Sequence, residues 1–188
     1  MPYSDVSYAN DLDDIRAAAA GNRLAQSALV TRHMPRVYAL SYRMLSDAAL
    51  AEDITQEVFL RAWKVLPDWE PRAQFSTWLH RVTLNLCRDY FRKKREQVVE
   101  ELPERIDPDL RPEERLDQSQ RAEWIMSAIN TLPDRQREAL ILCALDGHTN
   151  IEAAEIMDVS VEAMESLLAR GRRKLKSLMQ EQLQETGT

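Results

Sequence analysis

Glycine is scarce in this chain, with four among 188 residues. The long segments repeat their apolar residues at helical period, so the sequence predicts an all-α fold. No apolar run approaches the roughly 20 residues of a membrane-spanning helix, so membrane insertion is not expected. The stretch MPYSDVSYANDLDD has no basic region followed by an apolar one, so a signal peptide is not expected either. These absences predict a cytoplasmic protein.

Cysteine and histidine are also few. Cys87 and Cys143 both lie in helical patterns, which favours two buried thiols over a disulfide or a metal site. His33, His80 and His148 lack the spacing of metal ligands, so neither a metal nor a cofactor is predicted. The sequence shows no paired nucleophile and base and no phosphate-binding loop. An enzyme is therefore not expected.

The net charge of −6 hides an uneven distribution. Residues 72–95 contain seven lysines and arginines and one acid, whereas residues 96–120 contain nine acids and three arginines. Residues 166–178 contain five basic residues and no acid. Two basic patches around an acidic stretch predict two surfaces that face a polyanion, with a connecting segment between them.

Breaks in the helical pattern divide the chain into two halves. The stretch from about 96 to 112 holds three prolines and little periodicity, which is typical of a linker. We therefore expect two small helical domains, over 10–96 and 117–182, joined by a flexible acidic linker over 97–116. Helices are expected at about 12–20, 25–45, 48–66, 76–90, 113–130 and 133–147, and in two segments after Thr149 and Ser160.

The segment at 48–66 shows two distinct faces. Ser46 and Asp47 precede it and predict an N-terminal cap. An apolar stripe is expected to face the core, formed by Leu50, Ile54, Val58, Ala62 and Val65. A separate polar-edged face has the spacing i, i+3, i+4 and i+7, and consists of Asp53, Gln56, Glu57 and Leu60. Its simplest interpretation is a solvated acidic face with pairs such as Glu57 and Arg61.

The segment TNIEAAEIMDVSVEAMESLLARGRRKLKSLM has the pattern of a helix-turn-helix. Thr149 and Glu152 predict a capping box, and Asp158 suits a left-handed turn beside the apolar Val159. The second helix has an apolar stripe made of Val161, Met164, Leu168, Gly171, Leu175 and Leu178. Its opposite face is polar and basic, as in a helix that enters the major groove. The alternative is a helical hairpin with a solvated basic face.

Four segments in order resemble bacterial sigma factors: AEDITQEVFLRAWKVLPDW, FSTWLHRVTLNLCRDYFRKKR, TLPDRQREALIL and the helix-turn-helix. The resemblance covers roughly residues 10 to 180 and is to the small extracytoplasmic-function class, group 4, of the sigma-70 family. It implies a region 2 bundle and a region 4 helix-turn-helix. It also implies a non-catalytic subunit that brings core RNA polymerase to promoter DNA and assists melting.

The resemblance assigns roles to residues of region 2. Asp53, Gln56, Glu57 and Leu60 would dock on the largest polymerase subunit. Asn85 matches a position at a loop between two helices, where the family captures a base flipped from the −10 element; an amide offers both a donor and an acceptor. A capping asparagine is the alternative. The residues expected to hold −10 phosphates are Arg81, Arg88, Arg92, Lys93, Lys94 and Arg95. Trp69, Phe75, Trp78, Tyr90 and Phe91 are interpreted mainly as core residues, with base stacking as the alternative.

Region 4 would read the −35 element through Glu165, Ser166, Arg170, Arg172, Arg173 and Lys174. Glu165 and Leu167 depart from the family pattern, which has basic residues at these positions. The departure leaves open whether Glu165 reads cytosine or only repels phosphate. The net negative charge predicts weak binding of the free chain to DNA.

Three other interpretations compete with a sigma factor. A sigma-like decoy would bind an anti-sigma factor without touching DNA, but such modules are usually attached to a receiver domain, and no segment of this sequence is expected to form one. A regulator with two helix-turn-helix units would leave DITQEVF without a role. An enzyme would need a catalytic site, and the sequence shows no pattern of one. The resemblance also implies an anti-sigma factor as a partner, although no residue here identifies it.

Overall fold

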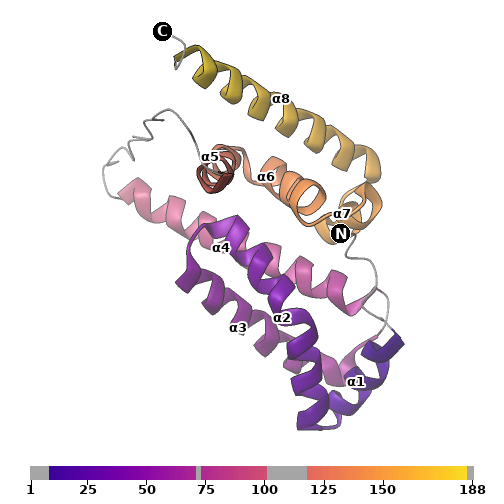
Figure 1. The fold of residues 1–188 in the computed structure, drawn as a ribbon. Coiled ribbons are helices and arrows are strands. Elements are labelled where there is room, and N and C mark those ends of the chain that lie inside the picture. The colour runs from indigo at the N-terminus through magenta and orange to yellow at the C-terminus, as the bar shows by residue number, and fades with distance from the viewer. Residues whose placement is uncertain (1–8, 71–72, 101–117, 186–188) are drawn as a thin grey trace.

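The computed structural model describes residues 9–70, 73–100 and 118–185, and in these ranges every regular element is a helix (Figure 1). The N-terminal half contains α1 (Ala9–Ala19), α2 (Arg23–Leu45), α3 (Ala48–Val65) and α4 (Phe75–Glu100). The C-terminal half contains α5 (Gln118–Asn130), α6 (Asp134–Leu140), α7 (Asn150–Met157) and α8 (Val161–Glu185). A 3₁₀ turn at Leu66–Asp68 follows α3, and a π-helical turn at Ile141–Leu145 continues α6. The all-α prediction is confirmed.

Local capping explains where the N-terminal helices begin. The Asn22 side chain accepts hydrogen bonds from the backbone amides of Leu24 and Ala25 at the start of α2. Asp47 caps α3 by accepting from the amide of Leu50 at 3.0 Å, as predicted. These carboxamide and carboxylate oxygens satisfy amides that have no partner within the first helical turn.

The buried face of α3 differs in part from the predicted stripe. Val58 and Ala62 are buried as expected, but Val65 is 38% exposed. The buried face is instead formed by Ala51, Thr55, Val58, Phe59 and Ala62. The prediction differs because it followed aliphatic residues alone, whereas the buried face also includes the hydroxyl-bearing Thr55 and the aromatic Phe59.

The predicted helix-turn-helix is present in α7 and α8. Thr149 and Glu152 form a complete capping box at the start of α7. Asp158 ends that helix in the left-handed conformation, with φ of 55°, and the partly buried Val159 packs against the core. In α8 the predicted stripe faces inward: Met164, Leu168 and Gly171 are buried, and Val161, Leu175 and Leu178 are half-buried.

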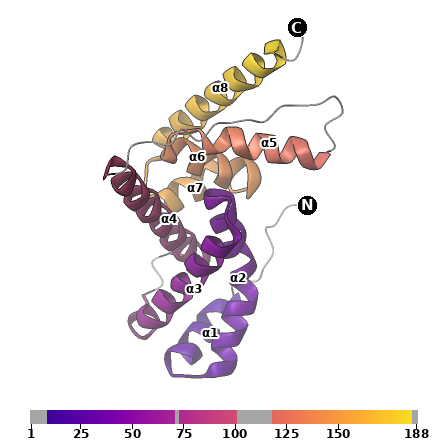
Figure 2. The same ribbon diagram turned by 90° about the vertical axis from the view of Figure 1, so that its left-hand side faces the viewer.

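The two halves share one hydrophobic core. Leu40 and Met44 of α2 and Leu84 and Cys87 of α4 belong to the same buried cluster as residues of α5 to α8. Helix α4 packs along α7, and both views place α1 and α8 at opposite ends of the molecule (Figures 1 and 2). A second buried cluster holds α1 to α4 together. The expected linker lies mainly outside the described residues, and its residues 97–100 form the last turn of α4.

The structure also describes the two cysteines, the possible metal ligands and the length of the apolar helices. Both cysteines are free; Cys87 is buried and Cys143 is half-buried, so the expected burial of both thiols holds fully only for Cys87. Within the described ranges, histidine, cysteine and carboxylate side chains do not gather into a group of three suited to a metal ion. None of the described helices has the length and apolar character needed to cross a membrane.

Candidate functional site

The predicted docking face, defined as Asp53, Gln56, Glu57 and Leu60, lies on the outer side of α3. Asp53, Gln56 and Leu60 are exposed, and Leu60 keeps 54% of its surface in solvent although it is a large apolar residue. Glu57 accepts a hydrogen bond from Arg61 at 2.7 Å, so the expected i,i+4 pair also forms. The Glu57–Arg61 pair accounts for the charge of Glu57 on this face, but it does not account for the exposure of Leu60. Single exposed apolar residues are common on protein surfaces, so the docking role of this face stays a prediction.

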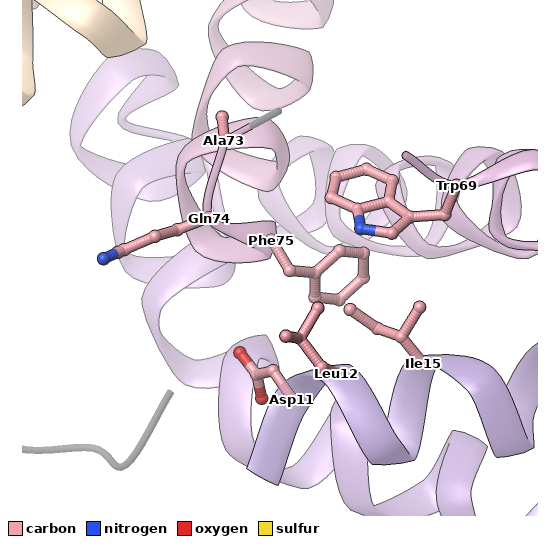
Figure 3. A pocket seen from close by; sticks show the side chains of 7 residues that line it. All are labelled: Asp11, Leu12, Ile15, Trp69, Ala73, Gln74 and Phe75. Atoms are coloured by element: carbon pink, nitrogen blue, oxygen red, sulfur yellow. The ribbon is translucent and has the colours of Figure 1, made fainter. Parts of the chain in front are cut away.

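The aromatic residues before and within the start of α4 mostly contact one another. Trp69 and Phe75 meet edge to face with ring centroids 5.4 Å apart, and Phe75 stacks on Trp78 at 6.1 Å. They lie beside an apolar cavity of about 230 Å³, shown in Figure 3 and lined by Asp11, Leu12, Ile15, Trp69, Ala73, Gln74 and Phe75. Phe75 is buried and Trp69 and Trp78 are half-buried, so packing accounts for most of this aromatic surface.

Asp11 at the edge of this cavity is held by two side chains of α2, Arg32 and His33. It accepts a hydrogen bond from Arg32 and lies 3.0 Å from Nε2 of His33. Burial acts to raise the pKa of Asp11, but His33 and Arg32 together hold it below its ordinary value. The carboxylate is therefore a structural anchor between α1 and α2.

Asn85 does not lie at a loop between two helices, as the resemblance implied. It is an exposed residue in the interior of α4, which runs without interruption from Phe75 to Glu100. It is therefore not a helix cap. Its Oδ1 atom accepts a hydrogen bond from Nη1 of Arg88 at 2.8 Å, one helical turn further on. The amide remains at the surface, and its orientation depends on Arg88.

Two of the predicted phosphate-binding arginines are held by the C-terminal half. Arg88 donates through Nε and Nη2 to the two carboxylate oxygens of Glu138, at 2.6 and 2.9 Å. Glu138 on α6 is completely buried. Arg81 donates to the backbone carbonyl of Glu155 on α7 at 2.6 Å.

The remaining predicted phosphate-binding residues lie near the end of α4. Arg95 pairs with Asp134 at 2.9 Å, and Arg92 pairs with Asp89 of its own helix at 2.9 Å. Arg92, Lys93, Lys94 and Arg95 are all exposed. This end of α4 therefore presents a basic surface, whereas Arg81 and Arg88 are engaged inside the molecule.

A reading face, defined as Glu165, Ser166, Arg170, Arg172, Arg173 and Lys174, lies on the outer side of α8. All six residues are exposed. Arg170 and Arg173 donate weakly to the backbone carbonyls of Ser166 and Ala169, one turn earlier. The structure thus presents an exposed helix face that carries Glu165 in its first turns after Asp158 and becomes basic from Arg170 onward.

Burial between the halves shifts several ionisable groups. It raises the pKa of Cys87 to about 12 and lowers the pKa of His80 to about 4. Burial also raises the pKa of Asp146 to about 6, although Arg43 pairs with it. The ring of His80 faces that of His148 edge to face at 5.2 Å.

Sequence reasoning missed the acceptors Glu138 and Asp146. Within TLPDRQREALIL, Glu138 appears as an ordinary surface acid of a helix. The one available signal is its place immediately before the run Ala139–Leu142, all of which is buried.

Comparison with known protein families gives two matches along the chain. The model for Sigma-70 region 2 matches residues 29–97, and the model for Sigma-70, region 4 matches residues 122–175. These segments correspond to the helices from α2 to α4 and to the helices from α5 to α8.

Individual relatives agree with the family models. The RNA polymerase sigma factor NccH of Alcaligenes xylosoxydans xylosoxydans is 34% identical over 179 residues, which cover 88% of this chain and 92% of NccH. The ECF RNA polymerase sigma factor SigE of Mycolicibacterium smegmatis is 33% identical over 162 residues, which cover 84% of this chain and 63% of SigE. The chain thus spans less than two thirds of SigE and nearly all of NccH.

A solved structure has the same fold over most of the chain. CnrH, in complex with the cytosolic domain of CnrY, matches with a TM-score of 0.69 and 28% identity, over 91% of this chain and 97% of CnrH. The sequence of CnrH is that of an RNA polymerase sigma factor from Cupriavidus metallidurans.

Proposed function

The chain belongs to the sigma-70 family, in its extracytoplasmic-function class of RNA polymerase sigma factors, and we propose that it acts as the group 4 form of that class. Such a subunit has no catalytic role of its own. It brings core polymerase to specific promoters and assists melting of the DNA. We place this activity in the cytoplasm, where polymerase and chromosome meet.

In this proposal, the two halves of the chain have separate binding functions. We assign residues 10–96 to polymerase docking and −10 recognition, through the docking face of α3 and the exposed Asn85 and basic end of α4. We assign residues 117–182 to −35 recognition, through the reading face of α8. The observation that carries the proposal is the exposed basic face of α8, which lies opposite the buried side of the same helix. A purely structural hairpin has no need of such a surface.

A protein partner is part of the proposal. CnrH has been solved with the cytosolic domain of another protein bound to it, and it shares the fold of this chain. We infer that an anti-sigma factor holds this chain inactive in a stress or envelope response.

In vitro transcription with purified core polymerase tests the function. Promoters are first selected from genomic DNA with the reconstituted holoenzyme, and the selected fragments then serve as templates. A promoter-specific transcript that requires this chain is the expected result. A decoy module would capture a protein partner yet yield no transcript on any selected fragment, and that outcome would remove the proposed function.

A further inference from the structure

Arg88 contacts the amide that is expected to meet the flipped base. Its Nη1 atom donates a hydrogen bond to Oδ1 of Asn85 at 2.8 Å. The other two nitrogens of the guanidinium, Nε and Nη2, donate to the carboxylate of Glu138 at 2.6 and 2.9 Å. All three nitrogens thus have partners within the chain, and one of these partners is the candidate base-reading residue itself.

The chemistry of arginine decides which atom of the amide faces Arg88. A guanidinium has five N–H donors and no acceptor, so it can bind the oxygen of an amide but not its NH₂ group. Turning the amide over would bring Nδ2 of Asn85 against the cation and lose the hydrogen bond. Hydrogen bonds to charged groups are stronger than neutral ones, which favours the observed orientation. Oδ1 is therefore held toward Arg88, and the NH₂ group is left for a ligand.

The pair of Asn85 and Arg88 lies within one helix. Both residues belong to α4, which is uninterrupted from Phe75 to Glu100, and residues three apart on a helix are neighbours on its surface. Asn85 is exposed, and the side chain of Arg88 is 29% exposed. The amide is therefore accessible to a base, and its orientation is set by a neighbour on the same helix.

An amide held in this way distinguishes bases by the central ring nitrogen of the Watson–Crick edge, which is the edge that reads a flipped base. This nitrogen is an acceptor in cytosine and adenine, whereas it carries a hydrogen in thymine and guanine. The NH₂ group of Asn85 can donate to the acceptor, but it meets a second donor in thymine and guanine. The positive charge of Arg88 behind the amide acts in the same direction, because a cation attracts acceptors and repels donors.

We propose that Arg88 is a positioning residue, which turns the NH₂ group of Asn85 outward so that the −10 site selects cytosine or adenine over thymine or guanine. The proposal rests on the proposed function, because it takes the capture of a flipped base by Asn85 as given. Without Arg88 the amide is free to turn over, and its oxygen then accepts from the ring N–H of thymine or guanine. Asn85 thus holds the base, and Arg88 determines which class of base is held.

Asn85→Asp tests the orientation while Arg88 stays in place. The measurement is holoenzyme binding to fork-junction fragments of a selected promoter, with each of the four bases placed in turn at every non-template position of the −10 element. At one position the parent should bind cytosine or adenine about tenfold more tightly than thymine or guanine, as for one hydrogen bond. Aspartate can only accept, so the variant should abolish or reverse this order. A parent that prefers thymine or guanine there, or a variant that keeps the parent's order, would overturn the proposal.

Arg88→Gln tests the positioning role. Glutamine both donates and accepts, so it holds the amide of Asn85 in neither orientation, and the discrimination at that position should fall several-fold. Arg88→Lys keeps a cation that only donates and should retain the discrimination. Arg92→Gln is the matched control, because Arg92 is an exposed arginine of the same helix that pairs with Asp89. It should weaken binding to all four bases equally, and an equal weakening by Arg88→Gln would leave Arg88 only a phosphate contact and sink its positioning role.

The two substitutions differ in their risk to the fold. Arg88→Gln loses the charge that faces the buried Glu138, whereas Asn85→Asp changes an exposed side chain and leaves that contact in place. If Arg88→Gln does not fold, Asn85→Asp still decides the orientation on which the role of Arg88 depends. Transcription by the parent chain reports separately on the proposed function. A promoter-specific transcript with an unchanged base order in Asn85→Asp removes only this proposal, and the absence of any transcript removes both.

Discussion

Cδ1 of Leu140 on α6 lies 3.0 Å from the place that a Cβ atom on Gly171 of α8 would occupy. Gly171 thus allows the two helices of the C-terminal half to approach closely. Gly171→Val should destabilise the fold by about 1–3 kcal/mol, because the added atoms meet the buried Leu140. Urea unfolding followed by circular dichroism measures the loss.

Ala169→Val is the control for this change, because Ala169 is an exposed position of the same helix. By helix propensity alone, valine should cost more in place of alanine than in place of glycine. Because of the contact with Leu140, we expect the reverse order, with Gly171→Val more destabilising than Ala169→Val. If Ala169→Val proves the more destabilising of the two, close helix contact at Gly171 is not important for stability.

The docking face predicts a loss of polymerase binding without a loss of folding. Asp53 and Gln56 are exposed and lie off the buried face of α3, so changing both to alanine should leave the thermal midpoint unchanged. Binding to core polymerase should weaken about tenfold, as for removal of central interface contacts. Competition against the labelled parent chain measures it. Asp13→Ala, an exposed carboxylate on α1, should compete like the parent, and equal competition by the double variant would mean that another surface docks.

Asn85 is predicted to act in melting. Asn85→Ala removes an exposed amide, so folding and core binding should be unaffected. A flipped base that loses its partner leaves polar groups unpaired, which costs about 1–3 kcal/mol. Permanganate reactivity of thymines in the −10 region should therefore fall sharply. Unchanged reactivity would leave Asn85 only the role of accepting a hydrogen bond from Arg88.

His80 predicts a loss of stability in mild acid. Burial lowers its pKa to about 4, from an ordinary value of 6.5. Between these values the unfolded chain binds a proton that the folded chain does not, so His80 contributes stability that is full above pH 6.5 and falls as the pH falls toward 4. The loss attributable to His80 should be about 2 kcal/mol near pH 5. Urea unfolding at about pH 7.5 and about pH 5 measures it.

Asp146 acts in the opposite direction across part of this range. Its raised pKa, about 6, means that the folded chain takes up a proton before the unfolded chain does, which adds stability as the pH falls. The His80→Gln variant separates the two effects. It should be less stable than the parent near pH 7.5 but lose less stability on acidification. An identical loss in both proteins would assign the acid sensitivity to other groups.

Local signals predicted much of the fold. Asp47 was expected to cap α3, the pair Thr149 and Glu152 to begin α7, and Asp158 to adopt a left-handed turn; all three are confirmed. Each of these caps and turns depends on side chains only a few residues apart in the chain, so a short sequence pattern is enough to predict it. The inward stripe of α8 follows from its period in the same way.

The contact between the halves was not predictable by the same means. Arg88 and Glu138 are 50 residues apart, and each has the appearance of an ordinary surface charge in its own helix. No periodicity signals that the two will meet and be desolvated together. The loop expected at Asn85 was wrong for another reason. It came from the resemblance, whereas the helical pattern of this chain already ran past Asn85, and α4 continues to Glu100.

Glu165 is exposed on α8, at a position where the resemblance implies a basic residue. Phosphate contacts are already predicted for Arg170, Arg172, Arg173 and Lys174, so we expect its carboxylate to accept a hydrogen bond from the amino group of a cytosine. Glu165→Ala should then cost about 1–3 kcal/mol on the cognate −35 element and relax preference at one base pair. Holoenzyme binding to single-base variants of the element measures this, with Glu162→Ala, an exposed acid one turn earlier, as the control. A uniform gain in affinity on every variant would mean that Glu165 only repels phosphate.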